Sequence, residues 1–417
     1  MNKNYFVLVL IFLLTLSLRL YFAFQSPYFN IEGYEVIRQV QHIEEKGLPL
    51  FKDELSYGGR DSIFPPLYYY ILAAFDLFLP EQLVFKLLPN IFISSLVFII
   101  FLISNHITKN QKISLFTAFL SGFIPIFYYK TINDISIYTL VIPLMSLLIF
   151  CFMKIEGNRR YVSYFILLLF LLRITHQSVL LLSIVLLLFL LLIKLIGLEQ
   201  NKIEIELVLF STFLILWSLF ITFKKAFLTH GYSLIWQNIP AEILSQFFKN
   251  ITILEAIYKI GIIPFIFGLY IIYKHILTEK NRNVYLLISF AFSITMLLLL
   301  RLIKLNAGLM FLSIVFVLLF SQALKKLLIH LRKTHFYRFK YPLIGLISAV
   351  FLLTSIIPSI IYANQSLSKI VTQKEILALK WLKDNSAKDD TVLSILEEGI
   401  LVTSVAKRKN VMDYNFI

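Results

Sequence analysis

The stretch Val179–Ile193 reads VLLLSIVLLLFLLLI and holds one polar side chain, Ser183, and no charge. Similar runs rich in Leu, Ile and Phe cover Tyr5–Phe24, Leu83–Ile103 and Tyr341–Ile361. Each approaches the roughly 20 residues with which an α-helix crosses about 30 Å of hydrocarbon. None alternates apolar with polar residues, as the strands of a membrane barrel do. Because only helices and closed barrels satisfy their own backbone in lipid, these runs predict membrane-spanning helices.

The composition places the whole chain in the same class. Of its 417 residues, 59% are hydrophobic and 15% are charged, and the mean hydropathy is +0.82. That apolar content exceeds what one soluble core could bury, so lipid must solvate much of the chain. We predict an all-α polytopic integral membrane protein, a helical bundle with about eleven membrane segments.

The charge distribution argues against a nucleic-acid-binding protein, and the cysteine count argues against a protein built on disulfides or cysteine-bound metal. The formal net charge is +15, but the basic residues form short clusters between apolar runs, so we expect no nucleic-acid partner. The single cysteine, Cys151, lies inside an apolar run, which excludes disulfides and cysteine-based metal sites within one chain.

The basic clusters predict how the chain crosses the lipid bilayer, because Lys and Arg concentrate in cytoplasmic loops. The clusters placed inside are Lys3; Lys109 and Lys112; Lys154, Arg159 and Arg160; Lys194 and Lys202; Lys274, Lys280 and Arg282; and Lys325 to Lys340, with Arg332, Lys333 and Arg338. The outer segments are then 25–65, 131–136, 173–178, 224–258, 301–306 and the tail from Tyr362. This scheme predicts a multi-pass protein of the cell membrane with a cytoplasmic N-terminus and an extracytoplasmic C-terminus.

The same scheme divides the chain into a transmembrane domain, residues 1–361, and an extracytoplasmic C-terminal segment, residues 362–417. Within the segment, Thr372–Asn385 predicts an amphipathic helix and Asp390–Ile395 a short strand. We expect a short α/β stub there, and its abrupt end at Ile417 raises the alternative that the outer domain is truncated.

One region leaves two interpretations open. Pro65–Leu79 is short for a span, yet it directly precedes the full-length run Leu83–Ile103. Only one net crossing fits there, so the first piece is a re-entrant or interfacial helix, or one inside assignment is wrong.

Acidic residues gather in the first outer loop, which predicts where chemistry takes place. Glu32 and Glu35 follow the first helix directly, and Asp134 puts another carboxylate on the same face within YYKTINDIS. A fixed carboxylate there can act as a general base toward a hydroxyl or can orient a divalent cation. The alternative is that these acids merely solvate their loops.

Cations lie at helix ends on the same predicted face: Arg173, His176, Arg301 and Lys304. Ionisable groups at membrane depth are costly and by default indicate a site, although snorkelling to the headgroups explains the cations equally well. His176 has no second histidine at ligand spacing, so a histidine metal site is not expected. The fingerprints of soluble nucleotide-binding enzymes and hydrolases are absent from the sequence.

The order of these parts resembles the GT-C superfamily of membrane glycosyltransferases, which includes protein mannosyltransferases, aminoarabinose transferases and the catalytic subunit of oligosaccharyltransferase, in particular its prokaryotic and archaeal members. The matching segments are FNIEGYE (29–35), RQVQHI (38–43), GLP (47–49), DELSYGGR (53–60), PPLYYY (65–70), Asp134, ALKWLK (378–383) and VMDYNF (411–416). The chain departs from the pattern in the first loop, where many members carry an acidic pair with Asp and this chain has Glu32 followed by Gly33.

The resemblance implies an enzyme that moves a sugar, with inversion, from a polyprenyl-phosphate donor to an acceptor on the extracytoplasmic face. It implies catalytic roles for Glu32, Glu35 and Asp134. Donor-phosphate binding would fall to Arg301, Lys304 and Arg173, and contacts in the substrate loop to Asp53, Arg60 and Tyr68. Because of the departure at Gly33, use of a divalent cation such as Mg²⁺ or Mn²⁺ stays open. Neither the sugar, a hexose or a pentose, nor the acceptor, a protein, lipid or glycan, can be named.

Two other functions remain as alternatives. A transporter or flippase for a lipid or solute would use the same ionisable residues along a pathway, but it favours charges in mid-span and repeated broken helices, which this sequence does not show. An inactive scaffold homologue would keep the fold and lose nothing when the loop acids are neutralised.

Overall fold

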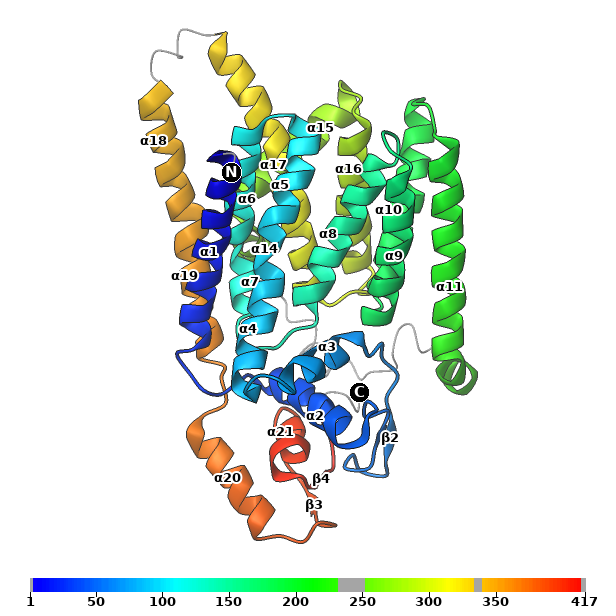
Figure 1. Ribbon diagram of the computed structural model, residues 1–417, viewed down its shortest axis with the longest axis vertical. Coiled ribbons are helices and arrows are strands. Elements are labelled where there is room, and N and C mark those ends of the chain that lie inside the picture. The colour runs from blue at the N-terminus through cyan, green and yellow to red at the C-terminus, as the bar shows by residue number, and fades with distance from the viewer. Residues whose placement is uncertain (1–2, 232–251, 334–339, 414–417) are drawn as a thin grey trace.

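The computed structural model describes residues 3–231, 252–333 and 340–413. Its long helices run side by side in one bundle, with short elements gathered at one end (Figure 1). The helices of the bundle are α1 (Lys3–Ala23), α4 (Glu81–Ser94), α5 (Leu96–Thr108), α6 (Gln111–Gly122), α7 (Pro125–Lys130), α8 (Tyr138–Lys154), α9 (Arg160–Thr175), α10 (Val179–Ile196), α11 (Lys202–His230), α14 (Ile253–Ile260), α15 (Ile262–Leu277), α16 (Arg282–Leu299), α17 (Leu305–Arg332), α18 (Lys340–Phe351), η2 (Leu352–Ile356) and α19 (Ile357–Leu367).

Within the described residues, eight helices are long and apolar enough to cross a membrane. A ninth is obtained if α14 and α15 form one span, which is bent by 96° at Gly261. The predicted multi-pass membrane protein is therefore confirmed, whereas the number of about eleven segments stays a prediction. Helix α8 is apolar but has 17 residues, which is short for a span.

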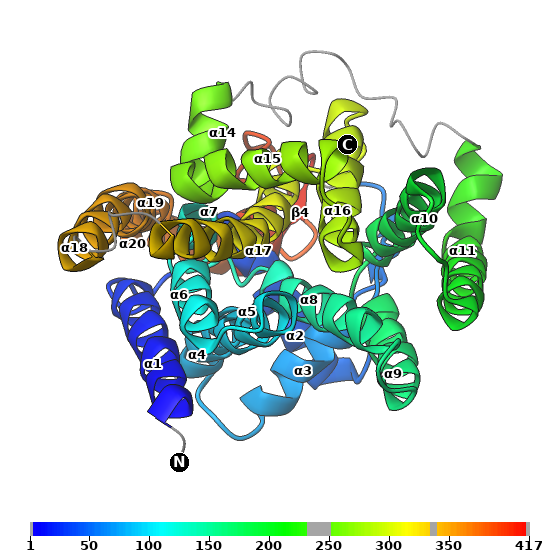
Figure 2. The ribbon, with the colours of Figure 1, turned by 90° about the horizontal axis from the view of Figure 1, so that it is seen from above.

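Burial differs sharply between the centre and the periphery of the bundle. Helix α17 lies in the middle, packed on α15, α16, α6 and α5 (Figure 2), and 94% of its most apolar window is buried. At the periphery only 22% of the corresponding window of α11 is buried, and Phe213, Trp217 and Leu228 are exposed. A helix that is apolar all round and exposed at its surface is typical of contact with lipid.

The segment between α1 and α4, here called the first loop, folds over one end of the bundle. It contains α2 (Ile31–Lys46), β1 (Lys52–Asp53), β2 (Arg60–Asp61) and α3 (Leu67–Asp76). Strands β1 and β2 are antiparallel, with Asp53 opposite Arg60, and the turn between them uses Gly58 and Gly59 at positive φ. Helix α3 packs on α2 across the bundle end (Figure 1) and its 10 residues are too few to cross a bilayer alone, and both interpretations of Pro65–Leu79 stay predictions.

The described basic clusters lie at the opposite end, which we call the basic end. There Lys280 donates to the carbonyl of Ile196, and Lys326 pairs with Glu279 at 2.5 Å. These contacts join loops that the sequence assigns to one face. Parts of the assignment fall outside the described residues: 232–251 of the loop 224–258, Arg338 and its neighbours 334–339, and the last residues 414–417.

The tail folds back onto the first loop. It contains α20 (Gln373–Asp384), β3 (Thr391–Val392), α21 (Gly399–Leu401), η3 (Val402–Ala406) and β4 (Lys409–Asn410). Helix α20 begins with a capping box of Thr372 and Glu375, and β3 pairs in parallel with β4. Asn410 joins the tail to the loop through Leu55 and Tyr57. The division at residue 361 stays a prediction, since α19 runs continuously across it to Leu367.

Candidate active site

The start of α2 meets the loop between α7 and α8 at the end of the bundle that carries the first loop. The amide of Asn30 donates to the carbonyl of Asn133 at 3.2 Å. A Cβ at Gly33 would lie 3.0 Å from the Cβ of Phe29 and 3.3 Å from that same carbonyl, so a larger residue would push α2 away. Gly33, which departs from the resembling family's pattern, is therefore explained by this close approach.

Glu32, Asp134 and Lys130 come together at this junction, and we call them the acid–lysine group. The Nζ of Lys130 lies 3.5 Å from Oε1 of Glu32 and 3.7 Å from Oδ2 of Asp134. The side chain of Glu32 is 66% exposed and that of Asp134 is 3% exposed. The side-chain amide of Asn30 donates to Oδ1 of Asp134. One accessible and one buried carboxylate thus share one ammonium.

Burial raises the pKa of the Asp134 carboxyl well above its usual range, and the charge of Glu32 adds to the rise. Lys130, Asn30 and Lys369 act in the opposite direction, because they favour the charged form. A carboxyl with a raised pKa beside an exposed carboxylate is an arrangement found at catalytic sites.

The backbone beside Asp134 is held in an uncommon conformation. Ile135 has a φ of +48°, which is rare for a β-branched residue. The hydroxyl of Tyr68 donates to the Ile135 carbonyl at 3.2 Å, and Tyr68 itself is fully buried. Tyr68, predicted to contact substrate, therefore lies behind this loop and supports it. Strain of this kind persists where surrounding contacts fix it, which is common at functional sites.

Two buried cations beneath the loop were not identified from the sequence. The ammonium of Lys86 donates to the carbonyls of Ser26 and Tyr28 and to Oδ1 of Asn133, at 2.7–3.1 Å. Arg19 donates to Asn90 at 2.9 Å and to Thr131 at 2.6 Å. These contacts connect α1 and α4 to the start of the first loop and to the loop between α7 and α8. The signal was present, since each is a charge inside an apolar run.

Further cations flank the acid–lysine group. Lys259 and Lys369 lie over the ring of Tyr129, at 4.5 and 3.8 Å from its centroid. Lys259 is almost fully buried and also pairs with Glu255 at 2.9 Å. The rings of Tyr138 and His176 lie 5.1 Å apart, and Tyr138 is within electrostatic range of Glu32.

The predicted phosphate-binding cations occupy different environments. Lys304 is exposed at the start of α17. Burial of the His176 ring and, after it, the charge of Lys304 lower the pKa of His176 to about 4. Arg301 is exposed in the same turn with a φ of +55°. Arg173 is buried, and its guanidinium donates to Ser218 and Thr222 of α11. The role of all three in donor binding stays a prediction, and for Arg173 the structure shows helix packing.

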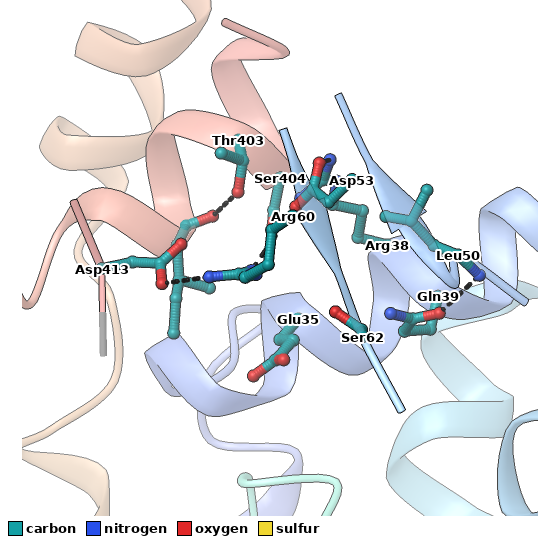
Figure 3. Close-up of a pocket in the computed structure, with 11 residues that line it drawn as sticks. Glu35, Arg38, Gln39, Leu50, Asp53, Arg60, Ser62, Thr403, Ser404 and Asp413 are labelled. Carbon is teal, nitrogen blue, oxygen red and sulfur yellow. Dashed lines mark hydrogen bonds and ion pairs between the residues drawn. The ribbon is translucent and has the colours of Figure 1, made fainter. Parts of the chain in front are cut away.

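A second charged cluster joins the first loop to the tail, and we call it the ion-pair chain: Arg38, Asp53, Arg60 and Asp413 (Figure 3). Arg38 grips Asp53 with two hydrogen bonds of 2.6 and 2.8 Å, and Arg60 reaches Asp413 at 2.7 Å. Burial would raise the pKa of Asp53, but hydrogen bonds and charge from Arg38 hold it below its ordinary value. Asp53 and Arg60, predicted as substrate-loop residues, are thus engaged with protein groups.

Glu35 lies on the side of α2 that faces this chain. It lines a cavity of about 20 Å³ with Ser62, Thr403 and the chain itself (Figure 3), room for about one water molecule. Glu32 and Glu35 are three residues apart but lie in different surroundings, Glu32 in the acid–lysine group and Glu35 beside the ion-pair chain. The structure brings together Glu32 and Asp134, and it does not bring Glu35 to them.

The acid–lysine group is a poor fit for a divalent cation. Mg²⁺ and Mn²⁺ prefer several oxygen ligands around the ion. In the described part of the chain, no group of three or more His, Cys, Asp or Glu side chains is placed to hold a metal. Two acids converge, and the ammonium of Lys130 already lies between them.

No protein-family model and no curated protein sequence matches this chain. Solved structures do match. The apo crystal structure of the Archaeoglobus fulgidus oligosaccharyltransferase superposes with a TM-score of 0.75 at 14% identity, covering 99% of this chain and 65% of that one. The archaeal enzyme in complex with an inhibitory peptide and a dolichol-phosphate gives the same values. Its complex with Zn and sulfate gives a TM-score of 0.69 at 15% identity, covering 98% and 62%.

These comparisons show that the chain has the fold of a membrane oligosaccharyltransferase, which confirms the resemblance at the level of fold. The particular structures that share it are those of the archaeal oligosaccharyltransferase. This chain spans 65% of the length of that protein.

Proposed function

We propose that this chain is a membrane glycosyltransferase that moves a sugar from a polyprenyl-phosphate-linked donor to an acceptor, with inversion at the anomeric carbon. The observation that carries the proposal is the acid–lysine group: an exposed and a buried carboxylate from separate loops meet on the fold of an oligosaccharyltransferase. The archaeal neighbour was solved with a dolichol-phosphate and a peptide, which supports a lipid-linked donor and leaves a peptide among the acceptor classes.

In the proposed reaction, a nucleophile of the acceptor attacks the anomeric carbon while the bond from that carbon to the phosphate oxygen breaks. Glu32 is the accessible carboxylate, so it positions the nucleophile and takes its proton. Asp134 is buried and holds Lys130. The bonding pair leaves with the phosphate, whose negative charge needs cations already in place. The candidates are Lys304, Arg301, Lys259 and Lys369.

The orientation of the chain is part of the same proposal. We place the basic end in the cytoplasm and the first loop outside, because Lys and Arg concentrate on the cytoplasmic side. Tyr57 and Asn158 are exposed at opposite ends of the bundle, in the first loop and between α8 and α9. In a Cys151-free background, an impermeant thiol reagent on intact cells should label a cysteine at 57 and not one at 158.

The deciding experiment is a transfer assay with the purified chain in lipid vesicles. Radiolabelled polyprenyl-phosphate hexoses and pentoses are supplied as donors, with peptide, lipid and glycan acceptors, and the anomeric configuration of the product is determined by NMR. Transfer with inversion, lost in Glu32→Gln and kept in Glu54→Gln, supports the proposal. Glu54 is a suitable control because it is an exposed acid of the same loop. Movement of the labelled lipid across the bilayer without transfer would instead make the chain a flippase.

A further inference from the structure

The position of Lys130 has a consequence for the chemistry of the site. Its ammonium lies between two carboxylates from separate elements, at 3.5 Å from Glu32 and 3.7 Å from Asp134. Lys130 ends α7, and the backbone leaves the helix at Thr131, so the approach to Asp134 is set by the fold of the loop. The ammonium thus occupies the position between the two carboxylates where a divalent cation would otherwise bind.

The oxygens of Asp134 are already engaged. Its Oδ1 accepts from the side-chain amide of Asn30, and its Oδ2 faces Lys130. An Asn nitrogen and a Lys nitrogen are hydrogen-bond donors and cannot ligate a metal in these roles. The oxygens left for a cation are those of Glu32 and the buried Oδ1 of Asn30, which has no hydrogen-bond partner.

The surroundings add positive charge of their own. Lys86 is fully buried, and its ammonium donates to three neutral oxygens, one of them Oδ1 of Asn133, the residue before Asp134, at 2.7 Å. Lys369 is close enough to favour the charged form of Asp134. A divalent ion entering the group would be repelled by Lys130 and by these neighbours, and the repulsion is strong where water is excluded.

We propose that Lys130 is the resident cation of this site, which holds Glu32 and Asp134 in place of a divalent metal. The catalytic part of this inference rests on the proposed function, whereas the metal-binding part does not. The ammonium fixes the two loops against each other and offers N–H donors to a leaving phosphate, which a lysine does as a point charge.

Binding of Mn²⁺, followed by electron paramagnetic resonance on the purified protein in detergent, tests the metal-binding part without any substrate. Wild type should show no binding that depends on Asp134. Lys130→Ala should gain a Mn²⁺ site, because three oxygens from Asn30, Glu32 and Asp134 become available, and Lys130→Ala/Asp134→Asn should lose it again. Lys46→Ala is the matched control, since Lys46 is exposed at the far end of α2.

Two outcomes would overturn the inference: Mn²⁺ binding to wild type that disappears in Asp134→Asn, or a Lys130→Ala variant that binds no more Mn²⁺ than wild type does. Size-exclusion chromatography establishes that each variant is folded, and Lys130→Met replaces Lys130→Ala if the smaller side chain destabilises the loop.

Activity gives a separate readout. Transfer by wild type should survive dialysis against EDTA, and transfer by Lys130→Ala should fall at least tenfold and recover in part when Mn²⁺ is added. Loss of wild-type transfer in EDTA, restored by Mn²⁺, overturns the inference and leaves the glycosyltransferase intact. If the chain transfers no sugar under any condition, the proposed function is wrong. The Mn²⁺ titration still tests whether Lys130 occupies the cation position between Glu32 and Asp134.

Discussion

The acid–lysine group and the ion-pair chain both begin in the first loop, yet their geometry differs. In the ion-pair chain, buried carboxylates alternate with partly buried guanidinium groups, and Arg38 uses two donors on Asp53 at 2.6 and 2.8 Å. In the acid–lysine group the distances are 3.5 and 3.7 Å, and Glu32 is 66% exposed. Buried bidentate pairs stabilise one arrangement, whereas an exposed carboxylate beside a shared ammonium can take a new partner. The geometry of the ion-pair chain is therefore typical of a structural contact, and the acid–lysine group is the cluster that we propose to be reactive.

Neutralising the acids of the acid–lysine group should produce the largest effect. Glu32→Gln keeps the shape and removes the charge, so we expect the transfer rate to fall by about 10² to 10⁴, the range for loss of a general base. The transfer rate of Asp134→Asn should fall as far, because Lys130 loses its buried partner. Thermal unfolding of Glu32→Gln should be nearly unchanged, since an exposed side chain contributes little to packing.

Glu35→Gln sharpens this prediction, because Glu35 is on the same helix but faces the ion-pair chain. We expect a small loss of rate in it. If Glu35→Gln is inactive and Glu32→Gln is active, the assignment of the two clusters is reversed. Full activity in the double variant would remove the first loop from the chemistry.

Breaking the ion-pair chain should have the second largest effect, on stability. Asp413→Asn leaves the half-buried guanidinium of Arg60 with one fewer charge partner, and breaking such a pair costs about 3 kcal/mol. The midpoint of thermal unfolding in detergent should fall, while the rate per folded molecule should stay within about threefold. A double-mutant cycle with Arg60→Ala should give a coupling of about 1 kcal/mol or more. Additive losses would show that the two side chains do not interact.

The contrast between the clusters also shows how far the sequence could lead. The apolar runs predict the bundle, and Glu32 and Asp134 are found because they follow helix ends. Lys130, four residues before Asp134, was not identified, since a lysine in a short loop looks like an interface residue until its distance to Glu32 is known. That distance depends on two segments about a hundred positions apart in the chain, which no local pattern reveals.

The predicted substrate-loop residues show the same limit of sequence reasoning. Asp53, Arg60 and Tyr68 were predicted to contact substrate from their place in an acidic, aromatic loop. In the structure Asp53 pairs with Arg38 of the same loop, Arg60 also reaches Asp413 of the tail, and Tyr68 is buried against the loop between α7 and α8. A sequence pattern gives the element and its face, but the partner of each charge comes from the tertiary fold.

The third prediction concerns Arg301, which lies exposed in the turn before α17. If it stabilises the leaving phosphate, Arg301→Ala should lower the rate about tenfold. Arg301→Lys should lower it less, because lysine keeps the charge and loses the fork geometry. Single-turnover kinetics at saturating donor separates a slower chemical step from weaker binding of the donor. Wild-type rates in Arg301→Ala would leave Lys259 and Lys369 as the phosphate cations.

The smallest expected effect is a shift in the pH profile. The ionised form of Asp134 is the one that holds Lys130, so activity should be present above the pKa of Asp134 and should fall as the pH drops through it. Because burial raises that pKa, the acid limb of the rate should lie well above pH 4, the usual range for Asp. Lys369 favours the charged form, so Lys369→Met should move the limb upward by a fraction of a pH unit. Lys374→Met is the control, because Lys374 is exposed on α20, and it should leave the limb in place. An acid limb near pH 4 in wild type would mean that Glu32, the exposed acid, sets the profile alone and that the protonation state of Asp134 does not limit the reaction.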